Sequence, residues 1–432
     1  MQPESKVLRP PLIGAFLIVA LSATVAAAAP PPRVVAVGDV HADLPALKAV
    51  LTEAGVLDAR GAWSGGNTIL VQLGDLVDRG PAMRATLDFM IALERQAAKH
   101  GGRSVAILGN HEVMNVIGDL RYVTPGNFAE FADAGSEIRR AAAWKQYVAY
   151  RKRQAGSFGQ PEPELGEAEE QAWLAAHPPG RLEHREAFGP KGKYGRWLRS
   201  RPAAFVFDGT AFVHGGVSPA LAVGPLSMLD QRLHEELAAF EADRQALVEA
   251  GVILPFFDIQ GASAAAGHTL DILRAAIAAE EAAAAEAGRK AKVPKKAAKL
   301  EALLERFVAW KTRLFASADG PLWYRGYSQW TDEEGAPEIA RVLAASGVKR
   351  FVVGHTPQPD ARVRVRFGGT VFLLDTGMLA AYYKGRGSAL ELEGGTATAI
   401  YAGEGRQVVW PAPAPTAAPT AAPAERSEDA SP

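Results

Sequence analysis

The chain has 432 residues, of which 48% are hydrophobic and 22% are charged, and its formal net charge is −1. This length and hydrophobic content suffice for one large core or for two smaller domains. The near-zero charge, without a block of lysine and arginine, argues against a nucleic-acid partner or an anionic membrane surface. The chain contains no cysteine, which excludes disulfides, cysteine-ligated zinc and thiol catalysis.

The N-terminal residues have the pattern of an export signal. Lys6 and Arg9 precede an apolar run from Leu12 to Val25, and alanines and then prolines follow it. We therefore expect a signal peptide over residues 1–29, and a periplasmic or secreted protein with no stable membrane insertion after cleavage. An uncleaved anchor is the alternative, because the apolar run approaches the ~18 residues of a membrane-spanning helix.

Strand-like and helical patterns alternate in the first part of the chain. Apolar runs predict strands over 33–37, 68–73 and 104–108. Apolar residues at helical spacing follow the first two strands, with Pro45 and Pro81 suited to the first turn of each helix. This order predicts a βαβ series, and hence a largely parallel sheet in a layered α/β fold.

The rest of the chain predicts further strands and two helical insertions. The insertions are expected over about 129–190 and 261–318, where alanine, arginine, lysine and glutamate dominate. Strands are expected over 204–207, 210–213 and 350–353, and the runs 363–367, 371–374 and about 389–392 should form a second sheet that closes a sandwich. The domain is expected over 30–408, followed by a disordered Pro/Ala-rich tail over 409–432.

Polar side chains follow five of the predicted strands. They are Asp39 and His41; Asp75, Asp78 and Arg79; Asn110 and His111; His214; and His355. A single histidine or aspartate after a strand is most often a capping or hydrogen-bonded residue. Five repetitions favour a site, because the carboxyl ends of strands in a layered sheet can meet along one rim.

These side chains offer nitrogen and oxygen donors without sulfur. Such a set suits two divalent zinc, iron or manganese ions and not a structural zinc built from cysteines. Two metals clamp an in-line displacement at phosphorus and convert water to hydroxide near neutral pH.

The motifs GDVHAD, GDLVDRG, GNHE, HGG and GHT, in this order, resemble those of the calcineurin-like metallophosphoesterases. The GDLVDRG and GNHE forms are similar to those of the phosphoprotein phosphatase group. The block 109–128 and the segment HREAFGPKGKYGRWL over 184–198 resemble its Shewanella-like, bacterial-type branch. The resemblance covers about residues 34–377 and implies a four-layer α/β/β/α sandwich of two mixed sheets with helical insertions.

The resemblance also implies a role for each motif residue. It implies that Asp39 and His41 bind one metal, that Asn110, His214 and His355 bind the other, and that Asp75 bridges both. His111 would protonate the leaving oxygen and Asp78 would hold it in place. Arg79, together with Arg325 of the YRGY segment, would grip the phosphate, since planar guanidinium forks suit phosphate oxygens.

Two residues depart from the family pattern. Ala42 stands where the family usually has glycine, which slightly crowds the loop that carries His41. Leu108 stands where the eukaryotic Ser/Thr enzymes have arginine, which moves the chain away from that group.

Three functions follow as hypotheses. The first is a metal-dependent phosphatase that hydrolyses phosphate monoesters, either phosphoprotein, including phosphotyrosine, or small phosphoesters. The second is a nucleotide or dinucleotide pyrophosphohydrolase, because such enzymes share these motifs. The third, a non-catalytic binding protein, is disfavoured because the ligand set is intact.

Overall fold

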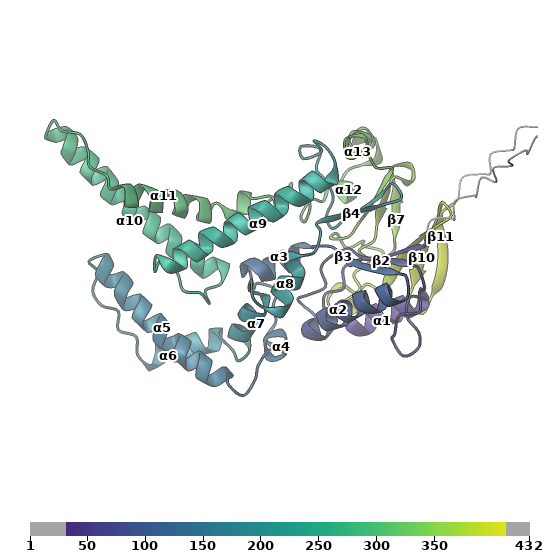
Figure 1. The fold of residues 1–432 in the computed structure, drawn as a ribbon, viewed down its shortest axis with the longest axis horizontal. Coiled ribbons are helices and arrows are strands. Elements are labelled where there is room, and N and C mark those ends of the chain that lie inside the picture. The colour runs from purple at the N-terminus through teal and green to yellow at the C-terminus, as the bar shows by residue number, and fades with distance from the viewer. Residues whose placement is uncertain (1–31, 412–432) are drawn as a thin grey trace, which may run out of the picture. The chain divides into compact units, whose positions relative to one another are not determined.

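The computed structural model describes residues 32–411 (Figure 1). The expected signal peptide and nearly all of the expected tail lie outside these residues. Within 32–411, no helix combines the length and the apolar character needed to cross a bilayer.

The first sheet has six strands in the order β11-β10-β9-β1-β2-β3. Its strands are β1 (Val34–Val37), β2 (Ile69–Gln72), β3 (Arg103–Ala106), β9 (Ser388–Glu393), β10 (Thr396–Tyr401) and β11 (Gly405–Trp410). The strands β1, β2 and β3 are parallel, and the helices α1 (Leu44–Glu53) and α2 (Met83–Lys99) connect them. The remaining strands pair antiparallel, so the sheet is mixed.

The second sheet has five strands in the order β4-β5-β6-β8-β7. Its strands are β4 (Ala204–Phe207), β5 (Thr210–Val213), β6 (Arg350–Val353), β7 (Arg364–Arg366) and β8 (Val371–Leu373). The central strands β5, β6 and β8 are parallel, whereas β4 and β7 pair antiparallel at the two edges.

Alternating side chains show how the two sheets pack. Val34 and Ala36 of β1 lie in one apolar cluster with Phe212 of β5 and Val352 of β6, so this cluster fills the space between the sheets. Val35 and Val37 point to the opposite face, where they join a cluster that includes α1 and α2. The outer face of the second sheet joins the same cluster as α13 (Asp332–Ser346). The expected α/β/β/α layering is therefore present.

The other helices lie mostly between β3 and β6. They are α3 (Asn110–Ile117), α4 (Pro125–Ala129), α5 (Ser136–Ser157), α6 (Glu167–Ala176), α7 (Arg181–Phe188), α8 (Lys193–Arg199), α9 (Leu226–Glu249), α10 (Ile259–Glu286), α11 (Lys295–Val308) and α12 (Gly326–Gln329), and α14 (Ala380–Tyr383) follows β8. Short 3₁₀ turns occupy Trp310–Thr312 and Phe367–Gly369. The second helical region starts earlier than expected, because α9 begins at Leu226 and not near residue 261.

The C-terminal strands differ from the expectation. The strand near residue 389 does not join the second sheet, because β9 pairs antiparallel with β1 through Val34 and Leu392. The hairpin of β9 and β10 turns at Gly394 and Gly395, whose φ values of 57° and 82° suit a two-residue turn. β10 and β11 were not expected, and β11 continues to Trp410, just past the expected domain boundary at 408.

Candidate metal centre

The loops after the strands adopt a backbone conformation that side chains rarely accept. Positive φ values occur at His41 (47°), Ala42 (58°), Asp75 (56°), Asp78 (71°), Arg79 (68°) and His355 (66°). Each costs on the order of 1 kcal/mol or more for a residue with a Cβ, and such strain concentrates at functional sites. Ala42 has a positive φ at the position where the family usually has glycine. The crowding expected in this loop is therefore strain in the backbone at Ala42.

Backbone hydrogen bonds join the first two loops. The amides of Val40 and His41 both donate to the carbonyl oxygen of Asp75, at 2.9 and 2.8 Å. The third loop packs against them without room for a side chain, since a Cβ on Gly109 would lie 2.3 Å from Asp75 Oδ1. The glycines of these motifs are therefore required by close approach of the loops.

Glu112 holds this arrangement together, a role that the motif alone did not reveal. Its carboxylate accepts hydrogen bonds from the amides of Asp75 (2.7 Å), Leu76 (2.8 Å) and Gly109 (2.9 Å). Burial, and then the charge of Asp75, raise the pKa of Glu112 to about 7. The sequence could have indicated this role, because Glu112 lies in the first turn of α3, where a glutamate commonly caps the start of a helix.

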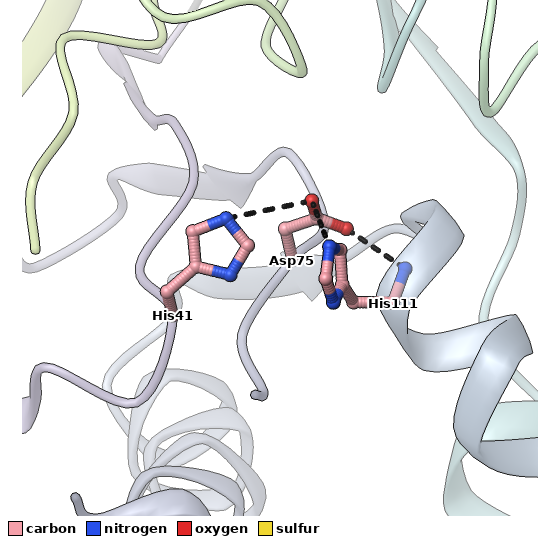
Figure 2. Close-up of side chains that lie close together, drawn as sticks. All are labelled: His41, Asp75 and His111. Carbon is pink, nitrogen blue, oxygen red and sulfur yellow. Dashed lines mark hydrogen bonds and ion pairs between the residues drawn. The ribbon is translucent and has the colours of Figure 1, made fainter. Parts of the chain in front are cut away.

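Two groups of ligand atoms share Asp75. His41, Asp75 and His111 form one group, and Asp75, His214 and His355 form the other, with the atoms of each group within 4.8 Å of one another. Figure 2 shows the first group, in which His41 Nε2 and His111 Nε2 lie 3.7 and 3.8 Å from Asp75 Oδ2. Asp75 thus occupies the central position that a bridging carboxylate requires.

The side chain of Asn110 completes the second group. Its Oδ1 lies 2.9 Å from His214 Nε2, which is also 3.3 Å from Asp75 Oδ1. The other ring nitrogen of His214 donates to the Leu73 carbonyl oxygen at 2.7 Å, so Nε2 is the one left for a ligand. Burial alone would lower the pKa of His214, but the carboxylates of Asp75 and Asp39 raise it to about 10.

Asp39 is buried like the other expected ligands but lies outside both groups of ligand atoms. Its Oδ1 accepts the amide hydrogen of His355 at 3.0 Å. Burial, followed by the charge of Asp375, raises its pKa well above the usual value. Asp375 is a buried residue that we had not singled out, and burial raises its pKa to about 6. Asp375 could have been identified by the same pattern as the other candidate ligands, because it is a carboxylate just after a strand, β8.

The residues present fit a pair of divalent metal ions. Buried carboxylates gather here with imidazoles and an amide, and burying like charges together is costly without a cation to compensate them. His355 Nε2 is buried without a hydrogen-bond partner. The expected ligands therefore all lie at one place: Asp39, His41, Asp75, Asn110, His214 and His355. They are carried by loops that follow strands of both sheets, and not of a single sheet.

His111 and Asp78 form a pair within the same site. His111 Nδ1 lies 2.6 Å from Asp78 Oδ2, and both side chains are buried. The other carboxylate oxygen of Asp78 accepts a hydrogen bond from Asn115 Nδ2 at 2.9 Å. This contact fixes the imidazole ring and leaves its Nε2 directed toward Asp75, where it could act either as a ligand or as an acid.

The two expected phosphate-binding arginines border the site. Arg79 Nη1 donates to His41 Nε2 at 2.5 Å and also to the Tyr383 hydroxyl. Its guanidinium lies 4.7 Å from the Tyr122 ring centroid and 5.2 Å from that of Tyr382. Arg325 Nη1 donates to the His355 carbonyl oxygen and to Thr356 Oγ1, both at 3.0 Å. The tyrosines around Arg79 were not anticipated from the sequence.

Several known proteins are similar to this chain. Residues 32–238 match the family model described as calcineurin-like phosphoesterase. The chain is 29% identical to the uncharacterized protein C1840.07c of Schizosaccharomyces pombe, over 82% of this chain and 75% of that protein. It is 44% identical to Shewanella-like protein phosphatase 2 of Arabidopsis thaliana over 23% of this chain and 26% of that protein. It is also 33% identical to Shewanella-like protein phosphatase 1 of Plasmodium berghei, over 28% and 33% of the two chains.

A solved structure gives a weaker likeness. The cold-active protein-tyrosine phosphatase of a psychrophilic Shewanella species is 23% identical, with a TM-score of 0.48 over 87% of this chain and 80% of that chain. The family model and the phosphatase relatives together agree with the motifs and with the two groups of ligand atoms. Residues 32–238 therefore form a calcineurin-like phosphoesterase domain, and parts of the chain are similar to Shewanella-like protein phosphatases.

Proposed function

We propose that this protein is a metal-dependent phosphatase that hydrolyses phosphate monoesters, with aryl phosphates such as phosphotyrosine as its best substrates. The observation that carries the proposal is the pair of ligand groups that share Asp75, with the His111–Asp78 pair beside them. The relatives named as Shewanella-like protein phosphatases support the same chemistry.

Each residue then has a defined task. Asp39 and His41 would hold one metal ion, Asn110, His214 and His355 the other, and Asp75 both. Manganese, iron and zinc all suit this mixed nitrogen and oxygen set. Such ions activate water and stabilise charge on the transferring phosphoryl group. His111 donates a proton to the leaving oxygen, and Asp78 orients its ring.

The surroundings of Arg79 favour an aryl ester. Tyr122 and Tyr382 lie against its guanidinium, and Tyr383 bonds to it. These contacts restrain the guanidinium that would grip the phosphate. Tyr382 is 58% exposed, so an aromatic surface is available beside the phosphate position. A phosphotyrosine ring can stack there, whereas a phosphoserine side chain has no ring to offer.

The test combines metal removal with a substrate panel. The purified protein should hydrolyse p-nitrophenyl phosphate, and exhaustive chelation should abolish the activity until Mn²⁺, Fe²⁺ or Zn²⁺ is restored. A phosphotyrosine peptide should be cleaved faster than its phosphoserine counterpart and than a dinucleotide polyphosphate. Full activity after metal removal would contradict the mechanism, and a preference for the dinucleotide would favour a pyrophosphohydrolase.

We further propose that the mature protein is periplasmic or secreted. The charged start at Lys6 and Arg9, followed by the apolar run 12–25, supports this proposal. N-terminal sequencing of protein from the native host should give a terminus a few residues before Val34. Soluble cytoplasmic protein that retains Met1 would contradict it.

A further inference from the structure

A cavity of about 560 Å³ lies among α3, α7 and α9, outside the metal centre. In Figure 1 these helices lie between the sheets and the outer helices α5, α6, α10 and α11. One side of the cavity is apolar, with Val116 and Ile117 of α3, Phe240 and Val248 of α9, and Phe256. Its volume is that of a site for a small organic molecule.

Two guanidinium groups from different helices line the same cavity. Arg185 of α7 donates through Nη1 to the Asn115 carbonyl oxygen at 2.8 Å, and Arg244 of α9 donates through Nη2 to the Phe257 carbonyl oxygen. On their other sides, Arg185 Nε and Arg244 Nη1 are buried without a hydrogen-bond partner. Each arginine is thus held by the backbone and keeps an unused donor.

Neither arginine forms an ion pair with an acidic residue in the part of the chain that the structure describes. The half-buried acids nearby are bonded to other arginines: Glu241, which lines the cavity, accepts from Arg199 Nε at 3.0 Å, and Asp258 accepts from Arg181 at 2.8 Å. Glu186 also lines the cavity, but it is exposed. The cavity is therefore lined by two guanidinium groups whose nearest acids are ion-paired with other arginines, a costly arrangement for buried charges.

The pKa values of the two arginines reflect this cost. Burial, and then the charge of Arg244, lower the pKa of Arg185 to about 9. Burial lowers the pKa of Arg244 to about 10. Both side chains remain charged at neutral pH, and a bound anion would relieve the repulsion between them.

We propose that this cavity binds an organic anion, whose phosphate, sulfonate or carboxylate head contacts Arg185 and Arg244 and whose apolar body contacts Phe240, Val248 and Phe256. Guanidinium forks are suited to such oxyanions, and two of them converge on the cavity. The bound molecule lies against the back of α3, the helix that carries Asn110 and His111. The site is independent of the proposed phosphatase activity.

Gly118 shows how Arg185 reaches this position. It ends α3 with a φ of 88°, and a Cβ there would lie 2.9 Å from the Arg185 guanidinium carbon. Because glycine leaves this space free, the guanidinium packs against the end of the helix and bonds to the Asn115 carbonyl oxygen.

Calorimetric titration of the metal-loaded full chain with naphthalene-2-sulfonate tests the proposal, because this probe is not a phosphate ester and cannot be hydrolysed as one. We expect saturable binding, at least about tenfold tighter than that of the uncharged naphthalene-2-methanol or of inorganic phosphate alone. Arg244→Met should weaken binding of the sulfonate at least about tenfold. The matched control is Arg232→Met, an exposed arginine of α9 that does not line the cavity, and it should bind as the wild type does.

Two further variants keep the test decisive. Arg79→Ala removes the guanidinium at the metal centre and should leave sulfonate binding unchanged. Gln245→Glu places a carboxylate at an exposed position on the cavity lining, where it threatens folding little, and should weaken binding at least about threefold. Absence of saturable binding, equal binding of the uncharged probe, loss of binding in Arg79→Ala, or unchanged binding in both Arg244→Met and Gln245→Glu would each overturn the proposal.

Discussion

The metal centre and the insertion helices use buried polar groups in different ways. At the metal centre, short loops after strands bring carboxylates, imidazoles and amides into mutual hydrogen bonds, as in the contacts of Glu112 with Asp75 and Gly109. In the helices α7 and α9, buried donors such as Arg185 Nε and Arg244 Nη1 have no partner within the described residues, and neither ring nitrogen of His184 has one.

The difference shows what a buried polar group without a partner can mean. His355 Nε2 is also unpartnered, but it lies among the other candidate metal ligands, so a bound ion would satisfy it. The two arginines line a cavity, so an anion would satisfy them. His184 packs against the aromatic rings of Phe128, Phe131 and Phe188, and it should stay neutral there.

The largest effect is expected at the residue shared by both ligand groups. Asp75→Asn removes the charge that touches both metal positions, and metal content and phosphatase activity should fall together, the activity to background. Metal analysis by mass spectrometry, with p-nitrophenyl phosphate assays on the same samples, measures both. A variant that keeps two metals and wild-type activity would show that Asp75 is not the bridging ligand.

The next effect separates a proton donor from a metal ligand. His111→Asn should leave both metals bound and slow turnover by roughly 10²–10⁴, the usual contribution of general acid catalysis. An alkyl phosphate should suffer more than an aryl phosphate, because its poorer leaving group needs the proton. Asp78→Asn is the matched control, since it only orients His111 and should show a milder form of the same selectivity. Loss of metal in His111→Asn would assign His111 to the metal, and equal slowing of both esters would show that it is not the general acid.

The gathering of the candidate metal ligands at one place could be predicted from the sequence, because each motif brings its polar residues together in one short loop. Asp75, Asp78 and Arg79 lie within one loop, and the strand before them specifies where that loop points. Asp375 was missed although it follows a strand in the same way. The tyrosines near Arg79 could not be predicted, since Tyr122 and Tyr382 approach it only after distant segments fold together.

The fold shows the same limit. The parallel strands were predicted because buried runs such as Val34–Val37 are apolar throughout. The pairing of β9 with β1 could not be predicted, because the sequence pattern of β9 fits either sheet. Only the folded structure shows that β9 pairs with the edge of β1. The convergence of Arg185 and Arg244 likewise depends on the packing of α7 and α9, which no local pattern encodes.

The smallest effect is expected at His184. This residue tests whether a buried polar group without a hydrogen-bond partner can remain uncharged and bind no ligand. Its ring lies 4.5 Å from that of Phe188 and 5.0 Å from that of Phe131, and it is fully buried. Burial, and then the charges of Arg185 and Arg181, lower its pKa well below 6.5. As the pH falls below about 6.5, the unfolded chain therefore gains a proton at His184 that the folded chain does not, and the folded state loses stability.

The stability difference between wild type and His184→Leu isolates this contribution. From pH 7 to pH 5, wild type should lose free energy of unfolding relative to the variant, with a slope of at most about 1.4 kcal/mol per pH unit. Urea denaturation at several pH values measures it. His234→Gln is the control of opposite sign: the Asp230 carboxylate raises the pKa of the half-buried His234, so its contribution is present below pH 6.5 and is lost as the pH rises through the folded-state pKa. A flat difference for His184→Leu would mean that this imidazole takes up a proton in the folded state, and hence that a partner or a ligand reaches it.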